Sequence, residues 1–180
     1  MPKLYLVRHA EPALRGVLLG RKDPELSPRG REEARLKLGS LKVKIVYTSP
    51  LVRCRETARV ISAPVAVLDE LAEISLGDWD GRTWEEIEER WPEAARRKLS
   101  AWSRVTPPGG EPWIRFQERV LKALERIAAG ALPAAVVGHL AANAVVAERL
   151  TGRPAEEFVQ EYCEVKEFEI EPGGVHVDGP

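Results

Sequence analysis

The sequence contains few cysteines, few histidines and no long apolar run. Two cysteines among 180 residues, Cys54 and Cys163, are too few for the disulfide framework of a secreted protein, which favours a cytoplasmic location. The apolar runs are short and interrupted by charged residues, so we expect no signal peptide, no membrane-spanning segment and no membrane partner. The three histidines lack the spacing of zinc ligands, and no Walker-type loop is present, so the sequence predicts no metal and no cofactor.

An excess of charge of either sign is also missing. The chain has 27 lysines and arginines against 28 aspartates and glutamates, so no overall field attracts nucleic acid. No internal repeat or low-complexity linker divides the sequence, and 180 residues suit one domain with its own core. We therefore predict a single domain over residues 1–180. The oligomeric state is not readable from these features, and a homodimer stays open.

What is present is an alternation of strand-like apolar runs with amphipathic helical segments. The run from Leu4 to Val7 is short and rich in β-forming residues, which is typical of a strand buried on both faces. Ser27 and Ser49, each followed by proline, are interpreted as N-caps of helices. The pattern predicts an α/β fold, a three-layer sandwich whose mostly parallel central sheet is flanked by helices. Further strands are predicted over 43–47, 65–68 and 134–137, and further helices over about 116–127 and 141–150.

The middle of the chain departs from this alternation. Thr83 and Glu86 form a capping box, and Pro92 breaks the helix that they open, so we predict a small helical flap over about residues 78–112. All five tryptophans lie in this part of the chain, and we interpret them as a satellite core that roofs the site. In the alternative, Trp79 or Trp113 offers a flat face to an aromatic leaving group. The tail is expected to form a peripheral hairpin from strands at 164–169 and 174–177, with His176 on the surface.

Polar residues follow each of the four predicted strands of the sheet. The first strand ends at Arg8 and His9, and the second leads to Arg53 in the first turn of a helix. The third is followed by an acidic loop that contains Glu73, and the fourth ends at His139. Each of these residues, taken alone, has an ordinary structural explanation. Because the carboxyl ends of parallel strands meet at one edge of a sheet, we expect all five side chains to cluster there.

The motifs around these residues resemble those of the histidine phosphatase superfamily, the phosphoglycerate mutase-like group. In size and motifs the chain is most similar to the phosphatase branch, which includes α-ribazole phosphatases. Many members carry asparagine where this chain has Arg15, and serine or threonine where it has Gly138. The matching segments, in the family's order, are residues 6–11, 26–30, 48–53 with 56–58, 73–81, 108–111 and 136–139.

This resemblance implies a metal-independent phosphomonoesterase that hydrolyses small phosphorylated metabolites through a phosphohistidine. By resemblance, His9 is the nucleophile and Glu73 is the general acid and base. Arg8, Arg53 and His139 are the implied phosphate-binding residues, and His139 also stabilises the phosphoryl group. The chemistry suits these residue types, because arginine can bind phosphate oxygens bidentately and a poor alkoxide leaving group needs an acid.

Two other functions are weighed against this one. A cofactor-dependent phosphoglycerate mutase would share the first step, but the family's true mutases carry added segments that this compact chain lacks. A non-catalytic domain that binds phosphorylated ligands would not need the carboxyl group of Glu73. The sequence leaves open whether Arg15, Arg21 and Lys22 face solvent or contact the substrate.

Two further phosphatase signatures are rejected. The run from Asp78 to Gly81 superficially matches the element of aspartate-nucleophile phosphatases, but no unbroken buried strand precedes it. Cys54 stands five residues before Arg59, one short of the spacing in thiol phosphatases, and we expect it to pack in the core.

Overall fold

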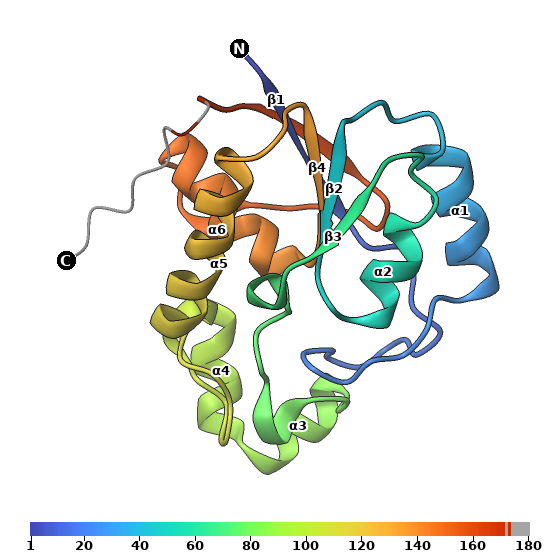
Figure 1. Ribbon diagram of the computed structural model, residues 1–180. Coiled ribbons are helices and arrows are strands. Elements are labelled where there is room, and N and C mark those ends of the chain that lie inside the picture. Colours follow the sequence, from blue (N-terminus) through green and yellow to red (C-terminus); the bar gives the residue numbers. More distant parts are fainter. Residues whose placement is uncertain (172, 174–180) are drawn as a thin grey trace.

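The computed structural model, which describes residues 1–171 and 173, contains a five-stranded sheet in the order β3-β2-β4-β1-β5. The first four strands run parallel, and β5 pairs antiparallel with β1 at the edge of the sheet. Helices cover both faces of the sheet (Figure 1), so the predicted three-layer α/β sandwich is confirmed. The strands are β1 (Lys3–Arg8), β2 (Ile45–Thr48), β3 (Val65–Val67), β4 (Ala134–Gly138) and β5 (Val165–Glu169).

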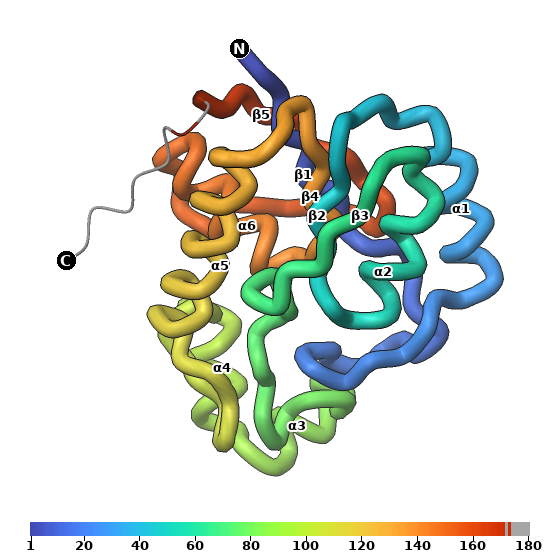
Figure 2. Tube along the Cα trace, in the orientation of Figure 1, coloured from blue at the N-terminus to red at the C-terminus, as the bar shows by residue number. Residues whose placement is uncertain are grey.

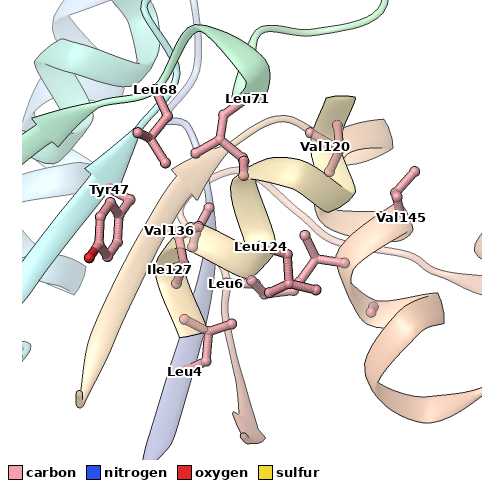
Figure 3. Packing of buried hydrophobic residues seen from close by; sticks show 14 of the residues in the cluster. Leu4, Leu6, Tyr47, Leu68, Leu71, Val120, Leu124, Ile127, Val136 and Val145 are labelled. Atoms are coloured by element: carbon pink, nitrogen blue, oxygen red, sulfur yellow. The ribbon is translucent and has the colours of Figure 1, made fainter. Parts of the chain in front are cut away.

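Alternate residues of the central strands face opposite helical layers. Leu4 and Leu6 of β1 pack against α5 (Trp113–Ala128) and α6 (Leu140–Thr151), as the close view in Figure 3 shows for Leu124. Val7 of the same strand belongs to the opposite cluster, which contains residues of α1 (Pro28–Leu38) and α2 (Val52–Ala58). Burial of both faces explains why β1 is an almost unbroken apolar run.

The helix before the second strand begins as the sequence predicts, and the helix after it does not. The Ser27 side chain caps α1 by accepting a hydrogen bond from the Gly30 amide, and Pro28 occupies the first turn. The prediction that Ser49 caps α2 is wrong, because Leu51 is the N-cap residue and makes no side-chain capping bond. The Ser49 hydroxyl instead hydrogen-bonds His139, a partner 90 residues away. Locally, the same oxygen accepts only a bond of 3.3 Å from the amide of Leu51, which is the N-cap residue itself.

The flap consists of α3 (Trp84–Arg90), α4 (Pro92–Ser100) and short 3-10 turns on either side. The predicted capping box is present, with reciprocal hydrogen bonds between Thr83 and Glu86. Trp79 is fully buried and packs against Trp84 and Trp91, so a satellite core is present for three of the five tryptophans, whereas Trp102 and Trp113 pack against the main core. Its complete burial excludes Trp79 as a flat surface for a ligand. The turns that flank the flap helices are Gly77–Trp79 and Trp102–Arg104. Elsewhere in the described part of the chain, 3-10 turns cover Asp69–Leu71 and Ala155–Glu157.

The tail runs along the edge of the sheet as β5. A strand is present at the position predicted for the first strand of the peripheral hairpin, and it pairs with β1. The second half, at 174–177, and His176 lie outside the described residues. Among the helices of the described part, none has the length and apolar character needed to cross a membrane.

The packing of α5 on the sheet gives a stability prediction. Replacing Leu124, which is fully buried in the larger cluster, with alanine should lower the free energy of unfolding by about 2–5 kcal/mol. The same truncation at Leu36, whose side chain is exposed on α1, should change it by less than about 0.5 kcal/mol. Urea unfolding followed by circular dichroism measures both, and equal losses would contradict the proposed core.

Candidate active site

Two histidines meet where adjacent parallel strands end. Strands β1 and β4 pair in register, with Arg8 opposite Gly138, and the next residues along the two strands are His9 and His139. The His9 amide donates a hydrogen bond of 3.0 Å to the Gly138 carbonyl. The two imidazole centroids are therefore only 5.2 Å apart, with the rings nearly edge to face. The clustering expected from parallel strand ends is present for these two side chains.

His9 is held in one tautomer by its neighbour. Its Nδ1 lies 2.8 Å from the carbonyl oxygen of Ala10, which can only accept a hydrogen bond, so Nδ1 carries the proton. The other ring nitrogen, Nε2, therefore keeps its lone pair in the neutral ring. Burial, followed by the positive charge of Arg53, lowers the pKa of His9 to about 3. His9 is thus neutral, with an unprotonated nitrogen, across the physiological range of pH.

His139 is buried more deeply than His9. Its Nε2 lies 2.8 Å from the Ser49 hydroxyl and 3.3 Å from the Cys54 sulfur. Burial, the neighbouring His9 ring and Arg53 hold the pKa of His139 well below its ordinary value. His139 is consequently neutral in the free protein and offers one N–H donor. Cys54 is fully buried in the cluster beneath α1 and α2, in agreement with the expected packing role.

Arg8 is held in place by the segment that precedes β5. Its Nη1 donates a hydrogen bond of 2.6 Å to the Gln160 carbonyl, and its guanidinium carbon lies 4.2 Å from the centroid of the Tyr162 ring. The Nε of Arg8 is buried and has no hydrogen-bond partner. Neither Gln160 nor Tyr162 is marked by any pattern in the sequence, because they follow Arg8 by about 150 residues.

Arg53 is fully buried, and the backbone of residues 20–22 holds its guanidinium group. Its Nη1 donates to the Lys22 carbonyl at 2.8 Å, and its Nη2 donates to the Gly20 carbonyl at 2.9 Å. These contacts use one N–H group of each terminal nitrogen, and Nη1 also lies 3.6 Å from a carboxylate oxygen of Asp23. The Nε of Arg53, like that of Arg8, is buried without a partner. Buried polar groups are rarely left unpaired, and an anion at the histidines could accept from both Nε groups.

Glu73 brings a carboxyl group to the same region. It is only 8% exposed, and its Oε1 accepts a hydrogen bond of 2.9 Å from the Ile74 amide. Burial raises the pKa of Glu73, although backbone N–H groups of Ile74 and Ala141 and the charge of Arg53 act in the opposite direction. The Ala141 amide belongs to the first turn of α6, directly after His139. The carboxyl group therefore keeps its proton to a higher pH than an exposed glutamate.

A partly buried ion pair holds the loop that carries Glu73. Arg119 on α5 forms two hydrogen bonds with the Glu111 carboxylate, at 2.7 and 2.8 Å. The same guanidinium donates to the backbone carbonyls of Glu70, Ala72 and Glu73. No sequence pattern marks Arg119 as a site residue, because an arginine on an amphipathic helix is ordinarily exposed.

A glycine allows a second segment to approach the same loop. Gly77 has a positive φ of 52°, and a Cβ at this position would lie 2.1 Å from the Pro108 carbonyl oxygen. The Asp78 amide donates to that oxygen at 2.9 Å. The matching motif segments 73–81 and 108–111 are therefore packed against each other, which explains the need for glycine at this contact.

A cavity of about 590 Å³ opens beside the histidines. Arg8, His9 and Glu73 line it, whereas Arg53 and His139 lie behind its wall. Most of the remaining lining is apolar and comes from the loop at 14–19, from α6 and from the flap. Trp102 is the tryptophan that lines the cavity, and Trp113 packs behind it with ring centroids 4.8 Å apart. The aromatic face available to a ligand therefore belongs to Trp102.

Asp80 holds the basic loop, residues 15–23 with Arg15, Arg21 and Lys22, against the flap. The Asp80 carboxylate accepts hydrogen bonds of 2.8 Å from the backbone amides of Gly20, Arg21 and Lys22. Figure 2 shows this blue loop alongside the green turn that leads into α3. Arg15 lines the cavity and pairs with Glu11 at 3.3 Å. The loop thus supports Arg53 through its backbone, while Asp80 holds the loop in place.

The described residues contain no group of three or more histidine, cysteine, aspartate or glutamate side chains arranged to hold a metal ion.

Comparison with known proteins identifies the family of this site. The family model described as the histidine phosphatase superfamily (branch 1) matches residues 4–179. Phosphoserine phosphatase 1 of Hydrogenobacter thermophilus is 37% identical over 136 residues, which are 71% of this chain and 64% of that protein. A 2,3-bisphosphoglycerate-dependent phosphoglycerate mutase of Methylobacterium radiotolerans is 34% identical over 172 residues, covering 82% of this chain and 80% of that protein.

The solved structures agree on the fold. The crystal structure of the α-ribazole phosphatase from Shigella flexneri superimposes with a TM-score of 0.82, covering 98% of this chain and all of the other at 24% identity. This chain spans less than two thirds of the phosphoserine phosphatase and 41% of longer mycobacterial relatives. The names of the relatives include phosphatases and mutases, consistent with the predicted enzyme class. With the family model covering nearly the whole sequence, the predicted family is confirmed, and the chain belongs to the histidine phosphatase superfamily.

Proposed function

We propose that the protein is a phosphomonoesterase that hydrolyses small phosphorylated metabolites through a phosphohistidine on His9. The observation that carries this proposal is the state of His9, a neutral ring whose Nε2 is unprotonated beside the buried Arg53 and the partly buried Arg8. The unpaired Nε donors of Arg8 and Arg53 supply positions for phosphate oxygens. The elevated pKa of Glu73 supports its role as an acid.

The reaction would proceed in two displacements. In the first, the lone pair of His9 Nε2 attacks phosphorus, the ester P–O bond breaks, and the leaving oxygen takes the proton of Glu73. The ring then carries a positive charge, which the Ala10 carbonyl stabilises through Nδ1–H. In the second, the Glu73 carboxylate takes a proton from water, which attacks phosphorus, and the N–P bond breaks. Free phosphate leaves, and the neutral ring of His9 and the acid form of Glu73 are restored.

Arg8, Arg53 and His139 would stabilise the charge that spreads over the phosphoryl oxygens during both steps. His139 does so as a neutral donor in the free protein, and an approaching dianion would raise its pKa towards protonation. The burial of Arg53 and His139 strengthens their interaction with the anion, because water screens charges less in the interior.

Phosphoglycerate mutase activity is the second candidate, favoured by the similarity to the Methylobacterium mutase. Incubation with 3-phosphoglycerate and 2,3-bisphosphoglycerate separates the candidates. A mutase forms 2-phosphoglycerate, whereas a phosphatase releases inorganic phosphate. A domain that only binds phosphorylated ligands would yield neither product from any ester.

Replacing His9 with alanine tests the nucleophile. We expect turnover of p-nitrophenyl phosphate to fall at least about a thousandfold, because no other described group in the cavity offers a comparable uncharged nitrogen. Rapid acid-free quenching with ³²P-labelled substrate should trap labelled wild-type protein and no labelled variant. The variant must first show the wild-type unfolding temperature. A folded His9→Ala protein that retains turnover would contradict the mechanism.

Replacing Glu73 with glutamine tests the acid. Esters of alkyl alcohols should lose about 10²–10⁴-fold in kcat/KM, and p-nitrophenyl phosphate much less, because its leaving group needs little protonation. For the wild-type protein, kcat/KM on alkyl esters should fall as pH rises through the raised pKa of Glu73, where the acid form disappears. With a pKa of about 3, His9 should impose no loss between pH 7 and pH 4. Equal impairment of both ester classes would argue against an acid role.

Replacing Arg119 with lysine tests whether the Arg119–Glu111 pair positions Glu73. Lysine keeps the charge but cannot reproduce the two bonds to Glu111 together with the carbonyl contacts, so alkyl esters should lose about tenfold more activity than aryl esters. Arg126→Lys is the matched control, since Arg126 lies on the same helix and pairs with Glu70 at the surface. A uniform loss on both ester classes would show a merely structural role.

A further inference from the structure

A lysine from the flap reaches the same cavity as His9. Lys98 lies on α4, and its side chain is part of the cavity lining. Its Nζ donates a hydrogen bond of 2.9 Å to the Val105 carbonyl. The same nitrogen lies 5.9 Å from the centroid of the Trp102 ring, within the range of a cation–π contact. The flap thus places a cation beside the aromatic face that it presents to the cavity.

Lys98 has no acidic partner. Within residues 1–171 and 173 it forms no ion pair with a carboxylate. Burial lowers the pKa of its ammonium group to about 8, so most of the population is charged at neutral pH. The Val105 carbonyl uses only one of its three N–H donors. A half-buried cation that lacks a counter-ion and lines a cavity is well placed to receive an anionic ligand.

The other cationic side chains of the cavity lining already have partners. Arg8 is fixed by the Gln160 carbonyl and the Tyr162 ring, and it belongs to the proposed phosphate pocket. Arg15 pairs with Glu11 and is 66% exposed. The wall of the cavity is otherwise largely apolar, and includes Leu14, Val17, Leu18, Ile74, Leu76 and Phe158. Lys98 is therefore the cation left over for a group of the ligand other than its phosphate.

We propose that the substrate is a phosphate monoester whose leaving group combines an apolar body with a second anionic group, and that Lys98 binds this second anion. The assignment rests on the phosphatase reaction proposed above. The phosphate lies at His9, the apolar body packs between the loop at 14–19 and the Trp102 ring, and the anion pairs with Lys98. The cavity of about 590 Å³ suits such an extended ligand, because sites of this size ordinarily bury drug-sized molecules.

A purely structural role for Lys98 would have different consequences. Its bond to Val105 links α4 to the segment that follows, so its loss could loosen the flap. A loosened flap would affect all substrates alike, whatever their charge. The preference between charged and neutral leaving groups of the same shape isolates the proposed contact.

The test compares matched pairs of substrates. Phenyl phosphates with a para alkyl chain of one to three carbons that ends in a carboxylate are assayed beside the corresponding amides, which have nearly the same size and leaving-group reactivity. At pH 7, kcat/KM of the wild-type protein should favour the best-fitting carboxylate by about tenfold, the scale of one charge-assisted hydrogen bond. The ratio should fall to near one in Lys98→Met and be partly retained in Lys98→Arg. Lys122→Met, an exposed lysine on α5, should keep the wild-type ratio.

Each outcome is decisive. A wild-type ratio near one at every chain length, or an unchanged ratio in folded Lys98→Met, would overturn the assignment. If Lys98→Met does not fold, as judged by circular dichroism, Lys98→Gln replaces it, and the wild-type ratio alone can still refute the proposal. Hydrolysis of both members of each pair without a charge preference refutes only the role of Lys98. Failure of the wild-type protein to hydrolyse either member refutes the phosphatase reaction itself.

Discussion

The site depends on two arginines, Arg53 fully buried and Arg8 partly buried, that lie beside two imidazoles. A buried guanidinium is costly unless its donors are satisfied, and here backbone carbonyls satisfy part of each group, those of Gly20 and Lys22 for Arg53 and that of Gln160 for Arg8. Carbonyls carry no formal charge, and the Asp23 carboxylate, 3.6 Å from Arg53 Nη1, neutralises only part of the positive field of the two arginines. This field and the exclusion of water together force the imidazoles into their neutral forms. The arrangement would thus receive an anion with little reorganisation.

Burial also shifts the pKa values of His9 and Glu73, the two groups proposed to share the chemistry, in opposite directions. It lowers the pKa of His9, whose charged form is a cation, and it raises the pKa of Glu73, whose charged form is an anion. Around neutral pH an unprotonated nitrogen and a carboxyl group with increased affinity for its proton lie in one cavity. The same buried environment therefore favours the protonation states of both the proposed nucleophile and the proposed acid.

The parts of this arrangement that follow from local sequence were predictable, and those that depend on contacts between distant segments were not. Strand periodicity and the rule that parallel strands end at one edge predicted that His9 and His139 would meet. Ser49 has the local pattern of a helix cap, but its hydroxyl bonds His139 instead, because the fold brings a buried imidazole to it. Arg119 and Asp80 each bind backbone groups of a segment 45 or more residues away, and no short pattern announces such bonds.

Different parts of the fold face the phosphoryl group and the leaving group. This separation explains how one family includes both phosphatases and mutases. The groups proposed to handle the phosphoryl group stand at the ends of the sheet or on loops clamped to it, so their geometry varies little with the leaving group. The cavity wall that faces the leaving group comes mainly from the loop at 14–19, from α6 and from the flap. Leu18 of that loop exchanges backbone hydrogen bonds with Gly81 and Arg82, and Asp80 binds the next three amides, so the two segments form one unit. Substitutions in this unit would change which ester fits, and how easily water reaches the proposed phosphohistidine, while leaving the proposed phosphate-binding residues intact.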